Sequence, residues 1–450
     1  MQFSHPSSRN PNNAQLTPHS RFTRSIAAQR HRRRRSSSLS TPTTSAALPT
    51  FPSSTTNTPR VSTLGLGTWS WGNRFLYNYD TSQDESIAEA FKEAARAGVT
   101  LFDSADSYGT GDLSGRAESL LGSFLNDRSL CSSSYRQSQV VAATKIAPYP
   151  WRVTGKMFER AARASVARMS GKSSDDDDSE TFSTLPPSRV VIQLHWSAAN
   201  YAPPQEAALW DGLLRCYDSG LCSAVGVSNF GPRQLAKISR FLEKNGVPLA
   251  VAQTQYSLLS CGSETEAAIS ASRDAGAVPL AYSPLALGML SGRYSVSNSS
   301  SSSSSSSSKS KNDSGERKAA NLPKGPRSVL FKKVLPGARG LLEVIDAVAA
   351  ETKVSSSSSP ASGGGVLETL LSPFAAASTT KTTTATPAQV AIAWCVAKRT
   401  VPIPGARTAS DVRSHVAAAT MRLPAGAVEE LDAAARAVRG GMTKNVFVTK

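Results

Sequence analysis

The feature that most constrains the fold is an eightfold alternation of short apolar segments with segments of helical periodicity. Each apolar segment is a nearly continuous run rich in Val, Leu and Ile, as in a parallel sheet that is buried on both faces. In chain order they are STLGLGTW, TLFDSA, QVVAATK, VVIQLHW, CSAVGVSN, LAVAQTQ, VPLAYSP and VPIPGAR. A strand–helix unit repeated eight times predicts a closed (β/α)8 barrel, or TIM barrel; the alternative is an open doubly wound sheet.

The predicted barrel domain spans residues 59–450 and contains three low-complexity insertions, at 171–187, 295–321 and 355–386. The first carries a run of Asp, the second is largely Ser, and the third combines Ser, Gly and Thr. Such compositions bury too little apolar surface to offset the entropy lost on ordering, so we expect disordered surface loops. Within the third insertion, the segment GVLETLLSPFAAA is expected to form a short helix.

Residues 1–58 form a separate arm that is rich in Ser, Thr, Pro and Arg. Residues 1–60 contain nine Arg and no acid, and they supply about half of the formal net charge of +17. This composition is typical of an organellar transit peptide, and the dominance of Ser and Thr favours the chloroplast over the mitochondrion. The alternative is a disordered basic tail that directs the chain to the nucleus.

Other classes of protein lack support in this sequence. The basic charge does not indicate a nucleic-acid partner, because about half of it belongs to an arm that import would remove. The loop GTGDLSG matches only part of the dinucleotide-binding motif G-x-G-x-x-G. No apolar run is long enough to span a bilayer and the five Cys form no C-x-x-C pair, so we expect no membrane span and no metal site. The oligomeric state stays open.

Four side chains of complementary chemistry follow the ends of three neighbouring predicted strands. Asp103 and Tyr108 follow the second strand, Lys145 ends the third and His195 ends the fourth. We expect them to meet, because barrel active sites are built at the carboxyl ends of the strands. A buried Lys145 balanced by Asp103 would lower the pKa of the Tyr108 phenol, and a neutral His195 would orient a carbonyl oxygen. Taken singly, a helix cap, loop packing and solvated strand ends are the alternatives.

The motifs FDSADSYG, AATK and QLHW resemble those of the aldo-keto reductases, a family of NADPH-dependent (β/α)8-barrel carbonyl reductases. The resemblance runs from about residue 61 to the C-terminus. It implies that Tyr108 is the general acid, that Lys145 and Asp103 tune its pKa, and that His195 orients the substrate carbonyl.

The resemblance also implies a binding site for NADP(H). In the segments GVSNF and QTQYS it implies contacts to the nicotinamide carboxamide from Ser228, Asn229 and Gln253. In YSPLALGMLSGRY it implies that Tyr282 stacks on the nicotinamide, and that the pyrophosphate contacts Ser283, Leu285, Gly288 and Ser291. In IPGARTASDVRSH it implies adenosine 2′-phosphate and adenine contacts from Gly405, Arg407, Asp411 and His415. A guanidinium suits a dianionic phosphate. The family usually has Gln at Asp411 and Asn at His415, so an acid here could weaken phosphate binding.

Less general segments, among them GTWSWGN, YPWR, LPKGPRSVLF and NVFVTK, resemble the plant chloroplast pyridoxal reductases within this family. This implies a small-molecule carbonyl substrate and the reduction of pyridoxal to pyridoxine. Trp69, Trp71, Trp151 and Trp196 would form aromatic walls for a flat ring, with packing as the alternative for each. The functional alternatives are a non-catalytic NADP-binding regulatory barrel and a general aldehyde-detoxifying reductase.

Overall fold

A computed structural model describes residues 61–109, 111–127, 140–171, 185–294, 321–356, 381–442, 445 and 447–449. Contacts divide the chain into the units Met1–Ser45 and Ala46–Lys450, and all described residues belong to the second. The N-terminal arm, most of each insertion and the short helix expected in the third insertion lie outside the described residues.

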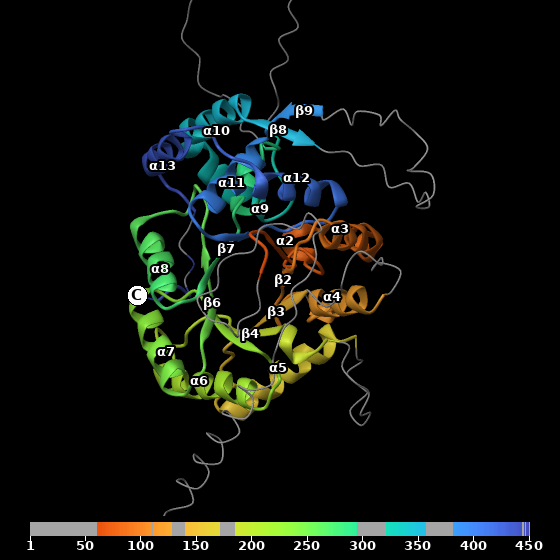
Figure 1. The fold of residues 1–450 in the computed structure, drawn as a ribbon, viewed down its shortest axis with the longest axis vertical. Helices are drawn as coiled ribbons and strands as arrows, with labels where there is room; N and C mark the ends of the chain where they lie inside the picture. The colour runs from red at the N-terminus through yellow and green to blue at the C-terminus, as the bar shows by residue number, and fades with distance from the viewer. Residues whose placement is uncertain are drawn as a thin grey trace, which may run out of the picture. The chain divides into compact units, whose positions relative to one another are not determined.

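Eight parallel strands form one sheet in sequential order (Figure 1). They are β1 (Gly65–Gly67), β2 (Leu101–Asp103), β3 (Val141–Ile146), β4 (Val190–Leu194), β5 (Ala224–Ser228), β6 (Leu249–Gln255), β7 (Val278–Tyr282) and β10 (Val401–Ile403). The sheet closes because Gly67 forms a parallel bridge with Gly405 and its N–H donates to Pro404 O at 3.1 Å. A Cβ on Gly67 would lie 2.9 Å from the carbonyl oxygen of Ile403, so this seam requires glycine. The predicted TIM barrel is confirmed, and the open doubly wound sheet is wrong.

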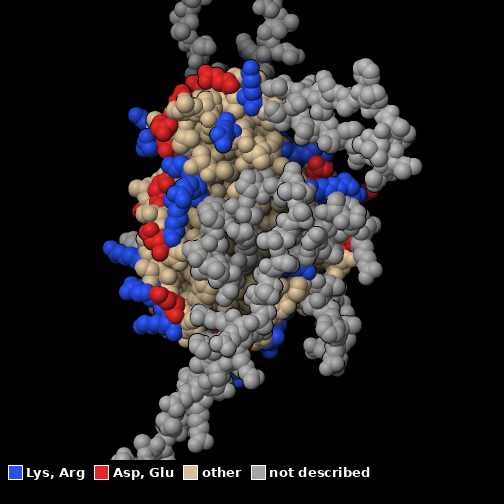
Figure 2. All heavy atoms as spheres, viewed as in Figure 1, with Lys and Arg blue, Asp and Glu red and all other residues tan. Residues whose placement is uncertain are grey.

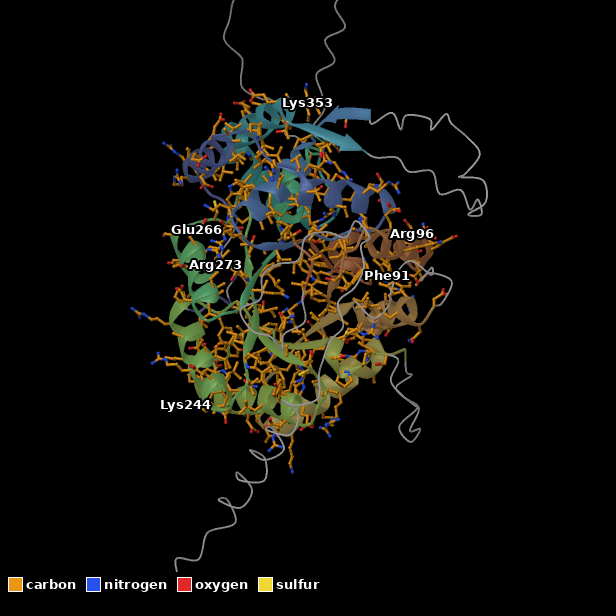
Figure 3. The ribbon with its side chains drawn as sticks, viewed as in Figure 1. Phe91, Arg96, Lys244, Glu266, Arg273 and Lys353 are labelled. Atoms are coloured by element: carbon orange, nitrogen blue, oxygen red, sulfur yellow. The ribbon has the colours of Figure 1, made fainter. Side chains whose placement is uncertain are left out.

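Helices that follow the strands cover the outside of the barrel (Figure 1). They are α3 (Asp84–Arg96), α4 (Arg116–Asn126), α5 (Gly155–Met169), α6 (Pro203–Asp218), α7 (Pro232–Lys244), α8 (Ser263–Asp274), α11 (Pro387–Ala397) and α12 (Ala409–Thr420). Helix α3 shows why the periodicity predicted them: Phe91 is buried and its ring lies 4.9 Å from that of Phe102 in β2, whereas Arg96 is exposed (Figure 3). Within the described residues, no helix has both the length and the apolar character that crossing a bilayer needs.

In the part of the chain that the structure describes, four further helices lie outside the eight strand–helix units. They are α2 (Arg74–Tyr77), α9 (Arg327–Val334), α10 (Arg339–Glu351) and α13 (Ala427–Ala437). Only α10 was expected from the sequence. The buried side chains of α9, α10, α11 and α13 form one hydrophobic cluster with side chains of the loop after β7. This cluster includes Phe331 of α9, Ile345 of α10 and Trp394 of α11. This cluster holds α9 beside the rim of the barrel.

The edges of the insertions are ordered over more residues than their composition predicted. β8 (Lys353–Ser356) pairs antiparallel with β9 (Lys381–Thr384), so both edges of the third insertion belong to a small sheet. Val354 and Ala385 are buried there, and Thr and Val favour strands. Leu185, at the edge of the first insertion, is also buried. The first and third insertions therefore begin or end with residues that pack against the barrel domain.

Acidic and basic side chains are interspersed on the visible part of one face of the molecule. On the part of the surface that is coloured in Figure 2, patches of Lys and Arg lie among patches of Asp and Glu. The visible part of this face therefore carries no continuous basic stripe.

Candidate active site

Asp103 and Lys145 form a buried ion pair at the rim of the barrel. Asp103 ends β2 and Lys145 lies near the end of β3, and the two side chains are each 2% exposed. Lys145 Nζ donates to Asp103 Oδ2 at 2.5 Å and to the carbonyl oxygen of Ser104 at 2.7 Å. The other carboxylate oxygen accepts hydrogen bonds from the side-chain amides of Gln193, at 3.1 Å, and Gln253. These hydrogen bonds offset the cost of burying both charges.

Gln193 is a site residue that the sequence analysis missed. It lies in β4 and is fully buried, and its amide nitrogen reaches Asp103 from the neighbouring part of the barrel. The available signal was a polar side chain inside an otherwise apolar strand, in the motif QLHW. Such a side chain needs a hydrogen-bond partner inside the barrel.

Tyr108 follows β2 in a loop and lies close to Lys145. The Lys145 ammonium nitrogen is 4.9 Å from the centroid of the Tyr108 ring. Burial raises the pKa of Tyr108 well above its ordinary value, and the carboxylates of Asp103 and Asp106 raise it further. The sequence analysis expected a lowered pKa for Tyr108, and the pKa is instead raised, because burial is the largest effect and the charge of Lys145 is paired with Asp103. The raised pKa keeps the phenol protonated at neutral pH, as a proton donor must be.

His195, which follows β4, faces Tyr108 across the site. The two ring centroids lie 6.0 Å apart with their planes at 73°. Burial lowers the pKa of His195 well below its ordinary value, and the charge of Lys145 lowers it further. The imidazole is therefore neutral at neutral pH, and its Nδ1 lies 3.5 Å from Ser107 Oγ. The structure thus brings together the four side chains that the sequence analysis selected, Asp103 included.

The four predicted nicotinamide-binding residues lie at the ends of the next three strands. They are Ser228, Asn229, Gln253 and Tyr282. Asn229 Oδ1 accepts a hydrogen bond from the Tyr282 hydroxyl at 2.7 Å, and Asn229 Nδ2 donates to the backbone oxygen of His195 at 3.0 Å. The Gln253 amide nitrogen is turned toward the buried ion pair. These residues therefore adjoin the four side chains of the rim.

The predicted pyrophosphate-binding residues lie on the loop after β7 and on the 3-10 helix η5 (Ala286–Ser291). They are Ser283, Leu285, Gly288 and Ser291. The backbone is left-handed at Ser283, Leu287 and Gly288, where φ is 51°, 58° and 102°. Left-handed backbone at residues other than glycine is strained, and such strain clusters at ligand sites. The loop is therefore built as a tight turn on the rim.

Two arginine side chains flank Tyr77 beside this loop. Arg407 Nη1 donates to Tyr77 O at 3.0 Å, and Arg327 Cζ lies 4.9 Å from the centroid of the Tyr77 ring. Arg327 Nη1 donates to Leu287 O at 3.2 Å, while its Nε is buried without a hydrogen-bond partner. Neither guanidinium forms an ion pair with a carboxylate among the residues described. Two uncompensated guanidinium groups and an unpartnered buried donor fit a ligand that carries phosphate groups.

Arg327 was missed as a site residue. Its segment, LPKGPRSVLF, supported only a resemblance, and the second insertion separates it from β7. The signal that was available is an Arg in a segment with no acid nearby.

Three of the residues expected around the adenosine 2′-phosphate and the adenine differ in their surroundings: Gly405, Asp411 and His415. Gly405 pairs with Gly67 at the closing seam of the barrel. Arg293 donates to Asp411 Oδ1 at 2.8 Å, so an arginine offsets the acid that was expected to weaken phosphate binding. His415 on α12 is 4% exposed and its Nδ1 has no hydrogen-bond partner in the described part of the chain. Burial lowers the pKa of His415 to about 4, so its imidazole is neutral.

Two of the predicted aromatic walls lie next to Tyr108 and His195. The ring centroid of Trp69 is 6.3 Å from that of Tyr108, and the ring centroid of Trp196 is 4.8 Å from that of His195. Trp196 also stacks on Phe447 at 4.3 Å. These side chains give the mouth of the barrel flat apolar surfaces.

The other two tryptophans differ from each other. Trp151 is 65% exposed and stacks on Tyr149, with ring centroids 4.7 Å apart. Trp71 is fully buried and its Nε1 donates to Ala406 O at 2.9 Å, so it is a core residue and its assignment as a substrate wall is wrong. Trp69 and Trp71 lie in one loop, and a loop has no periodicity that predicts which of the two side chains is buried.

Comparisons with known proteins agree with this arrangement. The model of the Aldo/keto reductase family matches residues 63–436. A chloroplastic pyridoxal reductase of Arabidopsis thaliana is 39% identical over 390 residues, which cover 87% of each chain. An uncharacterized oxidoreductase of Mycobacterium tuberculosis is 27% identical over 384 residues, which cover 84% of this chain and 91% of the relative.

Solved structures show the same fold. The thermostable aldo-keto reductase Tm1743, in complex with the inhibitor epalrestat, superposes with a TM-score of 0.52 at 19% identity, covering 86% of this chain and 100% of the other. An aldo-keto reductase from Klebsiella pneumoniae in complex with NADPH gives a TM-score of 0.51 at 19% identity, covering 87% and 95%. Because the family match extends over most of the barrel domain, the chain belongs to the aldo/keto reductase family of oxidoreductases.

Proposed function

We propose that the protein reduces an aldehyde to an alcohol with NADPH, and that its substrate is pyridoxal, which it converts to pyridoxine. The observation that carries this proposal is the geometry of one proton donor. The Tyr108 ring lies between the ammonium of Lys145, 4.9 Å from its centroid, and the neutral imidazole of His195. This arrangement suits a carbonyl oxygen that accepts a hydrogen bond and then a proton.

The side chains have separate tasks in this reaction. Bound NADPH supplies a hydride, which forms the new C–H bond at the carbonyl carbon. Tyr108 donates its proton to the carbonyl oxygen, which completes the alcohol and leaves a phenolate. Lys145 lies beside that phenolate and stabilises its charge, and Asp103 holds the ammonium in place. His195, neutral and close to Tyr108, donates a hydrogen bond that orients the carbonyl.

The proposed preference for NADPH over NADH rests on the positive charge of two arginine side chains. Arg327 contacts the Tyr77 ring and Arg407 its backbone oxygen, and neither has a carboxylate partner among the described residues, so both are available to phosphate groups. Arg407 would bind the 2′-phosphate, which NADH lacks, and Arg327 would bind the pyrophosphate beside Leu287. Tyr282, Ser228 and Gln253, at the ends of β5 to β7, would contact the nicotinamide.

Two observations support pyridoxal as the substrate: the aromatic side chains beside the site and the similarity to a pyridoxal reductase. Trp69 and Trp196 present aromatic faces beside Tyr108 and His195, which suits a flat heteroaromatic aldehyde. The relative that is 39% identical is a pyridoxal reductase. That relative is chloroplastic, and together with the Arg- and Ser-rich arm this supports import of the present protein into the plastid.

The decisive experiment is a substrate panel with the purified full chain. NADPH consumption and product identity are measured with pyridoxal, methylglyoxal and a simple aromatic aldehyde, and again with NADH. We expect pyridoxal with NADPH to give the highest kcat/KM and pyridoxine as product. Preference for methylglyoxal would instead indicate a general aldehyde reductase, and NADPH binding without turnover of any aldehyde would indicate a non-catalytic barrel.

One variant tests the proton donor itself. Tyr108→Phe keeps the ring but removes the phenolic proton, so we expect kcat to fall by about 10²–10⁴-fold. The dissociation constant for NADPH, measured by fluorescence titration, should stay as in the wild type. Retention of more than about a tenth of the turnover would contradict the role given to Tyr108.

A further inference from the structure

The last described residues of the chain lie against the nicotinamide side of the site. Asn445 Nδ2 donates one hydrogen to Asn229 Oδ1 at 2.9 Å and the other to the Tyr282 hydroxyl oxygen at 2.8 Å. The Tyr282 hydroxyl in turn donates to Asn229 Oδ1 at 2.7 Å. The three side chains therefore form a closed triangle of hydrogen bonds. Asn445 begins the segment NVFVTK, which carried a resemblance but gave this side chain no role.

Neighbouring backbone contacts fix the direction of the Asn445 amide. Its Oδ1 accepts a hydrogen bond from Phe447 N at 3.0 Å, so the nitrogen end must face the site. Thr449 anchors the same segment, because its N–H donates to Asn229 O at 3.2 Å and its Oγ1 accepts from Gly231 N at 3.1 Å. The segment is thus held beside β5 by several contacts.

The triangle occupies the polar groups of Asn229. Its Oδ1 accepts two hydrogen bonds, and its Nδ2 donates to His195 O and to Ser228 Oγ, both at 3.0 Å. Every lone pair and hydrogen of this amide therefore has a partner within the protein. The Gln253 Oε1 atom has no hydrogen bond to the residues described and remains open to a carboxamide, as does the hydroxyl hydrogen of Ser228.

The triangle also restrains Tyr282. Its hydroxyl both donates and accepts, so two bonds at the far end of the ring oppose rotation of the side chain. Without Asn445, only the bond to Asn229 remains. A ring that must stack on a flat ligand binds it more tightly when its orientation is set in advance.

We propose that Asn445 is a positioning residue for the nicotinamide: it orients Tyr282 and Asn229 from the C-terminal segment and does not contact the adenosine half of the cofactor. This inference rests on the NADPH-dependent function proposed above. It predicts that loss of the Asn445 donors weakens binding of the nicotinamide half alone.

The test uses an isosteric variant and a matched control. Asn445→Asp keeps an acceptor for Phe447 N but removes both donated hydrogen bonds. Asn200→Asp makes the same chemical change at another contact to the segment, since Asn200 Nδ2 donates to Val448 O at 3.4 Å. Dissociation constants are measured for NADPH and for adenosine 2′,5′-bisphosphate, which lacks the nicotinamide.

We expect Asn445→Asp to bind NADPH about tenfold more weakly, because the Tyr282 ring is no longer held in its binding orientation, and to bind the bisphosphate as the wild type does. Asn200→Asp should leave both constants unchanged. Unchanged NADPH affinity in Asn445→Asp, or a parallel loss for both ligands, overturns the inference while the wild-type reductase activity stands. A wild type that binds neither ligand overturns the proposed function and the inference together. If Asn445→Asp does not fold, Asn445→Ala supplies the same comparison of two ligands.

Discussion

Burial of the His415 imidazole should make the free energy of unfolding depend on pH. The side chain is 4% exposed and its Nδ1 has no hydrogen-bond partner among the described residues. Burial lowers its pKa to about 4, the charge of Asp411 opposes this shift, and the charge of Arg293 adds to it. In the unfolded chain the same imidazole has its ordinary pKa of about 6.5.

The sign and size of the effect follow from proton linkage. Between the two pKa values the unfolded chain binds a proton that the native protein does not, so the free energy of unfolding falls as the pH falls. The full loss is reached below about pH 4 and amounts to about 3 kcal/mol, at about 1.4 kcal/mol for each pKa unit. Between about pH 7.5 and pH 5 the loss is about 2 kcal/mol.

Urea denaturation of the wild type and of His415→Asn at these two pH values measures the effect. Asparagine does not titrate, so the variant should lose about 2 kcal/mol less stability than the wild type between the two conditions. Carboxylates titrate in both proteins, and comparing the two differences removes their contribution. Equal losses in the two proteins, to within about 0.5 kcal/mol, would refute the assignment of a buried neutral imidazole.

Three further predictions concern the barrel and its charges. Lys145→Met leaves the buried Asp103 carboxylate unpaired and should lower the free energy of unfolding by about 3–5 kcal/mol; urea denaturation should show that adding Asp103→Asn recovers part of it. Arg327→Ala should weaken NADPH and NADH binding alike, whereas Arg407→Ala should weaken NADPH binding more, by about tenfold or more, in fluorescence titrations. Gly67→Ala places a Cβ 2.9 Å from Ile403 O and should destabilise the barrel by about 1–3 kcal/mol, measured by thermal unfolding.

The barrel was predictable because its strands and helices are encoded locally. Continuous apolar runs and helical periodicity depend only on residues close together in the sequence, and all eight strands appear where these patterns place them. The helices α9 and α13 were not predicted, because α9 follows an insertion and neither segment alternates with a strand. The β8–β9 pair was missed because its two strands are separated by a low-complexity segment, which gives no signal for pairing.

The sequence predicted which residues lie at the candidate site but not which hydrogen bonds they form. Strand ends meet at one rim of any such barrel, so Asp103, Lys145 and His195 had to lie near one another. Which hydrogen bonds they make depends on the register of distant strands. Arg327 and Asn445 come from segments far along the chain, and their roles become visible only when the distances to Tyr77 and Tyr282 are known.

The charge of Asp103 shows why register matters for the chemistry. Its carboxylate accepts hydrogen bonds from Lys145 in β3, Gln193 in β4 and Gln253 in β6, so three other strands of the barrel must be in register to saturate it. This carboxylate adds to the effect of burial, which is the larger of the two, in raising the pKa of the Tyr108 phenol. The pKa of the Tyr108 phenol therefore depends in part on a carboxylate whose partners come from three other strands, a long-range property that no local motif encodes.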